Sequence, residues 1–306
     1  MRNISYANSL FEQPWWLDIV APGNWNEIII KDKTENPIGR LAYVDYGKKI
    51  AMPPLTQTLG IWIAPELQND YGEQKKIINE IFSQFNKISN VQHILSPENS
   101  YVLPFKWLGY SIEPRFTYRI SDLSDCDKLY ANFHKIAKKN IKSAKNKVTL
   151  QYNVNIDTLW SMLNKTFEIQ NRKNPMSREL VCNIVSACEN SGHGKYIEAV
   201  DSSGNIHSCA YFVYDEQVCY YLFGASDPEY RNSGAQSLIL WDGIQFASEH
   251  SKVFDFEGSM IEGIENFFRQ FSANCTVYYE IQKISLIKKF SLLIKPYIKR
   301  MLGYKM

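Results

Sequence analysis

Two carboxylates separated by one residue are the strongest candidates for chemistry in this chain. Asp255 and Glu257 stand at the end of the predicted strand Val253–Glu257, where strand alternation would place them on the same face. Burial raises the pKa of a glutamate, so Glu257 could act as a general base, and Tyr221 could protonate a leaving group. A structural interpretation stays open, in which both carboxylates cap the next helix or pair with Arg269.

The polar segment before the predicted helix Gln236–His250 has the composition of an anion site. Free amides and the helix dipole at such an N-terminus attract phosphate or carboxylate groups. Arg231 could add a bidentate contact, and Gly234 would allow a close approach of the backbone. The candidate anion-binding residues are Arg231, Asn232, Ser233, Gly234, Ala235 and Gln236. An ordinary helix start would have the same composition.

The elements that must position these residues follow a similar order in both halves of the chain. The first half is predicted to contain a helix at Phe11–Val20, strands at Trp25–Lys31 and Pro37–Val44, a helix at Glu73–Ile88, a strand at Val91–Leu95, a short helix ending at Tyr110 and a strand at Phe116–Ile120. The second half is predicted to contain helices at Thr158–Asn171 and Arg178–Ser191, strands at Lys195–Val200, Ile206–Tyr214 and Val218–Gly224, the helix at Gln236–His250, the strand at Val253–Glu257, a helix at Ile261–Phe271 and a strand at Thr276–Ile281. This order favours an internal duplication. Backbone amides at the end of Val218–Gly224 could stabilise an oxyanion.

Two basic segments point to an anionic partner. The predicted helix Tyr130–Lys147 is dense in lysine and could hold a tRNA or a diphosphate-bearing substrate. The segment 281–306 has several Lys and Arg residues, no Asp or Glu, and an apolar opposite face. Such a tail could dock on an anionic membrane surface, or it could pack on the protein with its lysines in solvent.

Bulk composition excludes several classes of protein. The chain has 306 residues, is 45% hydrophobic and carries a net charge of +2, so we expect no DNA binding. It shows no signal-peptide pattern and no apolar run long enough to cross a membrane, which predicts a cytoplasmic protein that could lie peripherally on the inner face of the membrane. Its cysteines are scattered without ligand spacing, so we expect reduced thiols and no metal site.

The stretch from Tyr221 to Tyr279 resembles the GNAT acyltransferase superfamily, and more closely its Fem-type branch of peptidoglycan aminoacyl ligases. The matching residues are Tyr221-Leu222-Phe223-Gly224-Ala225-Ser226, Arg231, Leu238, Trp241, Ile244, Ala247, Phe254-Asp255-Phe256, Gly258, the run Gly263–Arg269 and Phe271. The segments Asn140-Ile141-Lys142 and Ala144-Lys145 resemble the basic stretch that precedes the second domain in Fem-type proteins.

This resemblance implies an α/β (α+β) fold of two tandem GNAT-like domains, each with a mixed central sheet flanked by helices. We expect an N-terminal GNAT-like domain at 1–125, a basic linker helix at 126–150, a C-terminal GNAT-like domain with the active site at 151–283, and a basic amphipathic tail at 284–306. The substrate is expected to contact Lys138, Lys142, Phe223, Ser259 and Arg269.

The resemblance also implies an N-acyltransferase that moves an acyl group from acyl-CoA to an amino group on a peptidoglycan or polysaccharide precursor, either small or lipid-linked. Gln236 stands where acyl-CoA enzymes carry Gly or Ala, and a side chain there would crowd a diphosphate. Two alternatives therefore stay open. One is a Fem-type ligase that uses aminoacyl-tRNA to extend a peptidoglycan bridge, and the other is a non-catalytic binding protein with the same fold.

Overall fold

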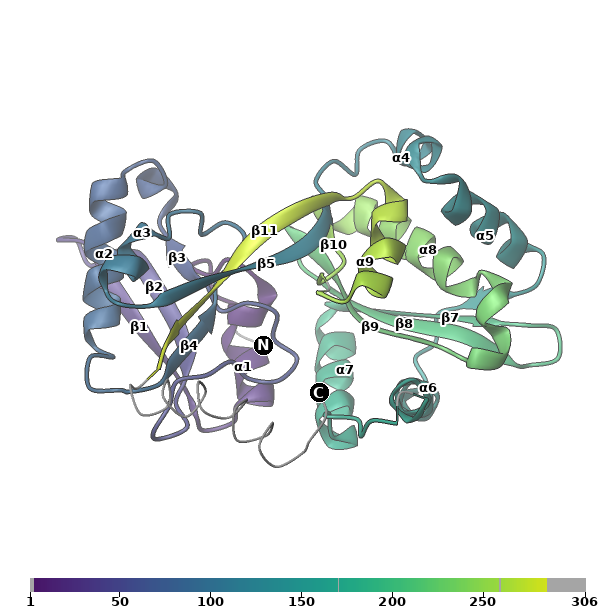
Figure 1. The fold of residues 1–306 in the computed structure, drawn as a ribbon, viewed down its shortest axis with the longest axis horizontal. Coiled ribbons are helices and arrows are strands. Elements are labelled where there is room, and N and C mark those ends of the chain that lie inside the picture. The colour runs from purple at the N-terminus through teal and green to yellow at the C-terminus, as the bar shows by residue number, and fades with distance from the viewer. Residues whose placement is uncertain (1–2, 170, 259, 285–306) are drawn as a thin grey trace, which may run out of the picture. The chain divides into compact units, whose positions relative to one another are not determined.

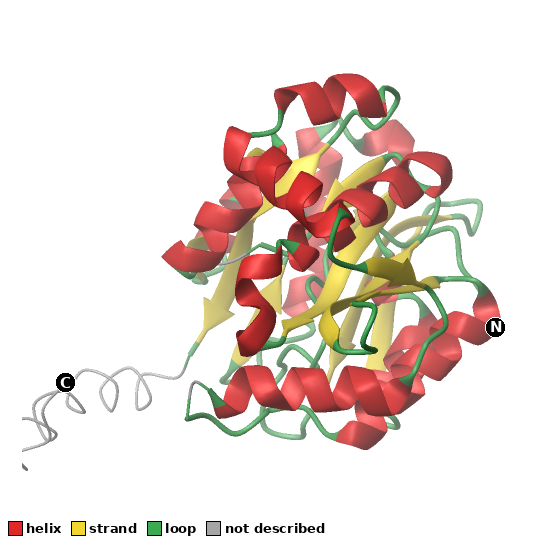
Figure 2. Ribbon diagram, turned by 90° about the vertical axis from the view of Figure 1, so that its right-hand side faces the viewer, coloured by secondary structure: helices red, strands yellow, loops and turns green. Residues whose placement is uncertain are grey.

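The computed structural model is a mixed α/β structure in which helices pack against strands (Figures 1 and 2). It describes residues 3–169, 171–258 and 260–284. Apart from Ile284, the predicted basic tail therefore lies outside the described residues, as does Ser259. Within the described residues we find no helix with the length and apolar character needed to cross a membrane.

Contacts divide the chain into two units, and each is discontinuous in sequence. The larger unit takes in Gln13–Val20 and Arg115–Val277. The smaller unit takes in Ile4–Glu12, Ala21–Pro114 and the described residues from Tyr278 onward. The chain thus passes repeatedly between the units, and the predicted domain boundaries at residues 125, 150 and 283 stay a prediction.

The smaller unit is built around two groups of strands and one long helix. Strands β1, β2 and β3 form an antiparallel sheet, and β4 pairs with the end of β11. The predicted apolar stripe on α2, with Ile77, Ile81 and Phe82, is buried in the core of this unit. The elements are η1 (Leu10–Glu12), β1 (Trp25–Lys31), β2 (Pro37–Val44), β3 (Ile61–Ile63), η2 (Pro65–Leu67), α2 (Tyr71–Ser83), β4 (Val91–Ile94), α3 (Leu103–Trp107), the start of β5 (Ser111–Ile120) and the end of β11 (Asn274–Lys283).

The sheet of the larger unit has the strand order β11-β5-β10-β9-β8-β7-β6. Strand β9 pairs with β8 in antiparallel orientation and with β10 in parallel orientation, which makes the sheet mixed as predicted. The hairpin from β7 to β8 turns at Asp201, whose carboxylate accepts from the amides of Ser203 and Asn205 at 2.9 Å each. Besides β5 and β11, its strands are β6 (Thr149–Gln151), β7 (Gly194–Val200), β8 (Ile206–Tyr214), β9 (Val218–Ser226) and β10 (Val253–Asp255).

Helices cover this sheet on both faces. Figure 1 shows α5 and α8 above strands β7, β8 and β9, and α6 and α7 below them. Helix α8 packs its apolar residues against the strands, and α5 packs against α8. The helices are α1 (Pro14–Val20), α4 (Cys126–Asn132), α5 (Lys135–Lys145), α6 (Ile156–Glu168), α7 (Arg178–Ser191), η3 (Pro228–Ser233), α8 (Ala235–His250), α9 (Glu262–Phe268) and η4 (Arg269–Phe271).

Most predicted elements agree with the structure, and the differences have local causes. The predicted lysine helix is interrupted, because Phe133 and His134 adopt extended backbone with ψ of 147° and 146°, which separates α4 from α5. The three-residue strands β3 and β6 were missed, because so short a segment shows no alternation. Strand β10 ends at Asp255, two residues earlier than predicted.

Candidate active site

A cavity of about 690 Å³ lies in the larger unit where strands β9 and β10 part. Their parallel pairing ends at Tyr220 and Asp255, whereas β9 continues to Ser226. On the other side of β9, Tyr211 pairs with Phe223 and Phe212 with Tyr221, so Leu222 is the extra residue of a bulge. Bulges redirect backbone groups beside active sites, and Leu222 lines the cavity. No local sequence pattern predicts this bulge.

The lining residues form a polar wall and an apolar wall. The polar wall includes Asn140, Thr166, His207, Ser226, Tyr230, Arg231, Ser233, Gln236 and Ser237. The apolar wall includes Phe256, Gly263, Ile264, Phe267 and Phe268. Tyr221 of β9 contacts both walls, through Gln236 Nε2 at 2.6 Å and the ring of Phe268 with centroids 6.0 Å apart. Leu222, Gly224 and Glu257 also line the cavity, and Glu257 follows Phe256 in sequence. The cavity therefore brings together Tyr221, Glu257 and most of the predicted anion-binding run.

Glu257 has the environment of a group that exchanges protons. Its Oε1 is buried and has no hydrogen-bond partner within the described residues. Burial raises the pKa of this carboxyl well above its usual value, and the neighbouring charge of Asp255 raises it further. Glu257 also has a left-handed backbone with φ of 58°, an uncommon conformation for a residue with a side chain. Strain and an unpartnered carboxyl at a cavity together mark a candidate general base.

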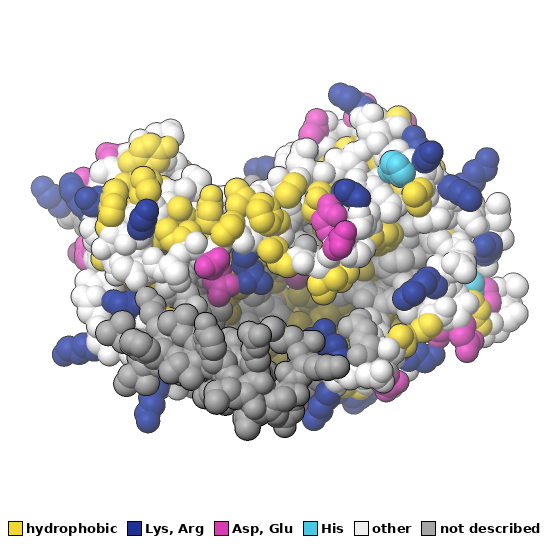
Figure 3. Space-filling model, in the orientation of Figure 1, with side chains coloured by type: hydrophobic (Ala, Val, Ile, Leu, Met, Phe, Trp, Pro, Cys, Tyr) yellow, Lys and Arg dark blue, Asp and Glu magenta, His cyan; other side chains and the backbone are white. Residues whose placement is uncertain are grey.

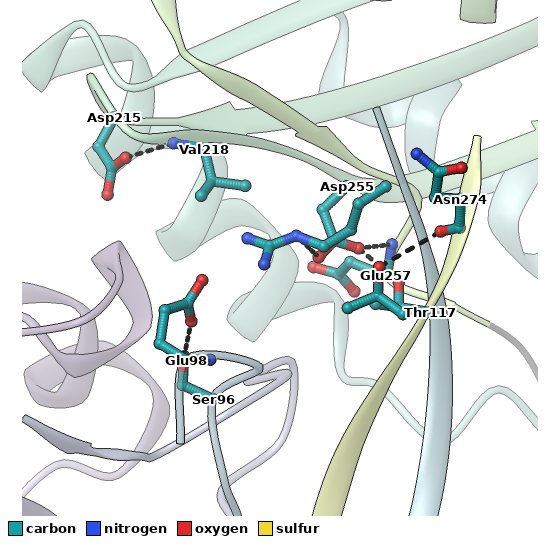
Figure 4. A network of polar contacts seen from close by, with 10 residues as sticks. Ser96, Glu98, Thr117, Asp215, Val218, Asp255, Glu257 and Asn274 are labelled. Atoms are coloured by element: carbon teal, nitrogen blue, oxygen red, sulfur yellow. Dashed lines mark hydrogen bonds and ion pairs between the residues drawn. The ribbon is translucent and has the colours of Figure 1, made fainter. Parts of the chain in front are cut away.

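Asp255 does not line the cavity, and its carboxylate is fully occupied with neighbours (Figure 4). Its Oδ1 accepts from Thr117 Oγ1 at 2.6 Å and from the backbone amide of Glu257 at 2.7 Å, and its Oδ2 lies 3.2 Å from Arg119 Nε. The partner is thus Arg119 rather than the expected Arg269. The expectation that Asp255 and Glu257 share a strand face was wrong, because the strand ends before Glu257. Asp255 holds the bend that presents Glu257.

The contacts of the Gln236 side chain show where it lies relative to the loop that could hold a diphosphate. Its Nε2 donates to Tyr221 Oη at 2.6 Å, and its Oε1 accepts from Ser226 Oγ at 3.1 Å and also from Ser208 Oγ. The side chain is therefore held against β8 and β9 and not over the preceding loop. The sequence predicted that this side chain would crowd a diphosphate at the loop, but the side chain points to the strands instead.

Tyr221 is held by the same network. Burial raises the pKa of its phenol, which keeps the hydroxyl protonated. A Cβ on Gly224 would lie 1.5 Å from Tyr221 Oη, so only glycine at 224 leaves room for the ring. No hydrogen bond joins Tyr221 to Glu257 among the described residues, although both line the cavity.

The loop before α8 carries an exposed cation beside the start of the helix. Arg231 lines the cavity and has no ion-pair partner among the described residues. Gly234 is the N-cap of α8, with φ of 84° and no side chain to cap the helix, and the Ser233 hydroxyl accepts from the Ala235 amide at 3.1 Å. A Cβ on Gly234 would lie 2.3 Å from the Asn140 carbonyl oxygen, so the glycine serves the packing of α5. Together with the displaced side chain of Gln236, these features fit an anionic group of a donor.

Several predicted binding residues do not line the cavity: Asn232, Phe223, Arg269, Lys138 and Lys142. Phe223 is buried beside Tyr211, and Arg269 pairs with Glu265 at 3.9 Å on the surface. Lys138 donates to the Ala131 carbonyl at 2.9 Å, and Lys142 is exposed on α5. We expected these residues to contact the substrate or an anion, but the fold does not bring them to the cavity.

Sequence reasoning missed most of the apolar wall and one histidine. His207 was interpreted as structural, yet it lines the cavity, stacks on Tyr230 with ring centroids 4.1 Å apart, and lies 3.2 Å from Asp201. The apolar wall had a signal in the run Gly263–Arg269, which was quoted for the resemblance but not assigned to the site. No group of three or more His, Cys, Asp or Glu placed to hold a metal occurs among the described residues.

Residues 131–269 match the family model described as an acetyltransferase (GNAT) domain, and this match covers the whole cavity. The part of the chain that carries the cavity is therefore an acyltransferase domain of the GNAT type, as predicted. By sequence, it has no match among curated proteins.

Solved structures extend the likeness to nearly the whole chain. The crystal structure of FemX matches with a TM-score of 0.71 at 13% identity, covering 94% of this chain and 95% of FemX. A tandem GNAT protein from the clavulanic acid biosynthesis pathway matches with a TM-score of 0.56 at 9% identity, covering 92% and 89%. L-PGS from Bacillus licheniformis matches with a TM-score of 0.55 at 10% identity, covering 88% of each chain. The fold is thus similar to that of FemX and of a tandem GNAT protein, which confirms the predicted fold class and the resemblance in fold to Fem-type proteins.

Proposed function

We propose that this protein transfers an acyl group from acyl-CoA to an amino group on a cell-envelope precursor. The observation that carries the choice of donor is the loop before α8. Arg231 and the positive end of the α8 dipole offer positive charge to a diphosphate, while Gln236 keeps its side chain on the strands. The envelope acceptor is proposed from the likeness to FemX, and we place the reaction in the cytoplasm, where CoA thioesters are available.

The reaction needs a base, an oxyanion site and a route for the departing thiol. Glu257 takes a proton from the attacking amine, whose nitrogen then forms a bond to the thioester carbonyl carbon. Backbone amides of β9 around the Leu222 bulge stabilise the oxyanion. The carbon–sulfur bond then breaks, and the departing thiolate takes the proton of the Tyr221 hydroxyl. The proton held by Glu257 restores that hydroxyl through water, so the products are an amide and free CoA.

A second donor is supported by a different observation. Helix α5 lies beside the cavity through Asn140 and presents exposed lysines at positions 135, 139, 142 and 145. A basic helix face is suited to a nucleic-acid backbone. Together with the FemX-like fold, it favours aminoacyl-tRNA as the alternative donor, with the same Glu257 and the same amide product.

Calorimetric titration with CoA and acetyl-CoA tests the first proposal. We expect binding that weakens on the order of tenfold in Arg231→Ala, because one charge-assisted contact is lost. Arg178→Ala is the matched control, since Arg178 is exposed and pairs with Asp157 away from the cavity lining. Absence of CoA binding at millimolar ligand would rule out acyl-CoA as the donor. Tight binding of charged tRNA that falls in Lys139→Glu and Lys142→Glu would then support the alternative.

A further inference from the structure

The inner side of α9 forms an apolar wall with unfilled space in front of it. Gly263, Ile264, Phe267 and Phe268 line the cavity and are spaced so that they share one side of the helix. Phe256 continues the wall and packs on Phe268, with ring centroids 5.0 Å apart. The only charged side chains among the described lining residues are Arg231 and Glu257.

Part of this wall is exposed in a way that core packing does not explain. Ile264 is 41% exposed although it faces the cavity. Gly263 has open space where a side chain would begin, since an added Cβ would meet no atom within 4 Å. In Figure 3, hydrophobic side chains reach the surface around α9 next to acidic ones. The wall is therefore apolar surface that an apolar group of the substrate could cover.

The position of Glu257 indicates which part of the substrate covers the apolar wall. Glu257 directly follows Phe256 of the apolar wall in sequence, and both residues line the cavity. A general base must lie within hydrogen-bond reach of the attacking amine, directly or through one water, so the carbonyl carbon under attack lies close to Glu257. The substituent on that carbon then extends along the neighbouring wall.

We propose that the transferred acyl group is apolar and longer than acetyl, and that it lies along the inner side of α9 in the space left by Gly263. This inference rests on the proposed acyl transfer, but it holds for an acyl chain from any activated donor. The chemistry that recognises the group is burial of its methylenes against Phe256, Ile264 and Phe267.

Binding of a matched thioester series tests the chain length. CoA, acetyl-CoA and hexanoyl-CoA are titrated by calorimetry, together with the acetyl and hexanoyl thioesters of N-acetylcysteamine, which lack the diphosphate. A fully buried methylene is worth about fourfold in affinity, so partial burial of four of them predicts hexanoyl at least about tenfold tighter than acetyl in both pairs. Equal affinity within both pairs, or no binding of either hexanoyl thioester at millimolar concentration, overturns the inference.

The two proposals fail in different ways in this series. Binding of CoA without a gain from the hexanoyl chain leaves the acyl-CoA donor intact and overturns the apolar acyl group. That result would assign the wall to the acceptor. A hexanoyl gain in the N-acetylcysteamine pair without any CoA binding keeps the acyl inference and rejects the donor.

Filling the space at Gly263 tests the location. Gly263→Phe is expected to abolish the hexanoyl gain while acetyl-CoA still binds, because the new ring occupies the position of the chain. Ile261→Phe is the matched control, since Ile261 is exposed and outside the cavity lining, and it is expected to retain the gain. A hexanoyl gain that survives in Gly263→Phe, or that is lost equally in Ile261→Phe, contradicts the assignment to α9.

Discussion

At the scale of single residues, the chemistry depends on how the fold treats two neighbouring carboxylates. Asp255 is held by Thr117 and Arg119 in a buried ion pair, whereas Glu257 has a buried oxygen without a partner among the described residues. The same side-chain chemistry therefore gives one charged anchor and one carboxyl whose pKa is well above its ordinary value. We therefore expect the two carboxylates to have different roles, with Asp255 as an anchor and Glu257 as the group that exchanges protons.

Glu257→Gln is expected to lower kcat by about 10²- to 10⁴-fold, because the amide cannot accept the proton of the amine. In the unsubstituted protein, only the ionised form of Glu257 is active. The acidic limb of kcat/KM should therefore rise with pH through a pKa well above that of an ordinary glutamate. Acyl transfer measured from pH 4 to 9 checks both points, with binding of CoA as the control for folding. An unchanged rate in Glu257→Gln would remove Glu257 from the reaction.

Glu12 in the smaller unit gives a residue-scale prediction about stability. It is 1% exposed, accepts from the amides of Asn8 and Gly60 at 2.8 Å each, and has its pKa raised by burial from 4.5 to about 7. The folded state then holds this proton more tightly than the unfolded state. The free energy of unfolding should fall as pH rises from 4.5 to 7, by up to about 3 kcal/mol from this group.

Urea unfolding at several pH values, compared with Glu12→Gln, isolates the contribution of Glu12. As pH rises across that interval, the unsubstituted protein should lose stability relative to Glu12→Gln. A difference that is constant with pH would show that Glu12 is ionised in both states.

At the scale of elements, the start of α8 is where packing and binding meet. Gly234 closes η3, begins α8 and lies against the backbone of α5, so three elements depend on its small size. Gln236, two residues later, ties α8 to β8 and β9 through Ser208 and Tyr221. The geometry of the proposed anion site is therefore set by contacts on three sides.

Gly234→Ala is expected to destabilise the protein by about 1–3 kcal/mol, since it combines a left-handed backbone with a clash against the Asn140 carbonyl. CoA affinity should fall with it, because the start of α8 must move. Gly263→Ala is the control: it meets no atom within 4 Å in a helical position, and we expect a gain of about 0.5–1 kcal/mol. Urea unfolding of both variants checks the signs, and equal stability of the two would contradict this account of Gly234.

At the scale of the whole molecule, the chain path makes the larger unit depend on a distant segment. Helix α1 belongs to this unit by its contacts, and it packs on α7 although more than a hundred residues separate them. Trp16 is fully buried, and Trp15 stacks on His193 with ring centroids 5.6 Å apart. The unit that carries the cavity is thus completed by residues near the start of the chain.

Trp16→Ala should cost about 3–5 kcal/mol, as expected for truncation of a buried aromatic side chain. Trp107→Ala, at a position 59% exposed, should change stability by less than about 0.5 kcal/mol. Hydrogen exchange of the α7 amides provides the local readout, and it should accelerate in Trp16→Ala alone. Unchanged protection of α7 in that variant would contradict the role of α1.

The sequence by itself determined what local patterns encode. Alternation and periodicity predict the strands at Trp25–Lys31 and Ile206–Tyr214 and the helix at Arg178–Ser191, and all three are present. In the structure, Ser177 caps that helix by accepting from the Leu180 amide. The acyltransferase class came from the resemblance of the stretch from Tyr221 to Tyr279 to the GNAT superfamily, which needs only the order of residues along the chain.

Only the tertiary structure decided which side chains meet. Asp255 accepts a hydrogen bond from Thr117, 138 residues away in sequence, and Gln236 accepts one from Ser208, 28 residues away. No local sequence pattern could reveal either contact. The bulge at Leu222 and the left-handed Glu257 arise where strands part, which depends on their partners and not on propensity. Burial then sets the pKa of Glu257, because desolvation depends on everything packed around the carboxyl and not on the residues beside it in sequence.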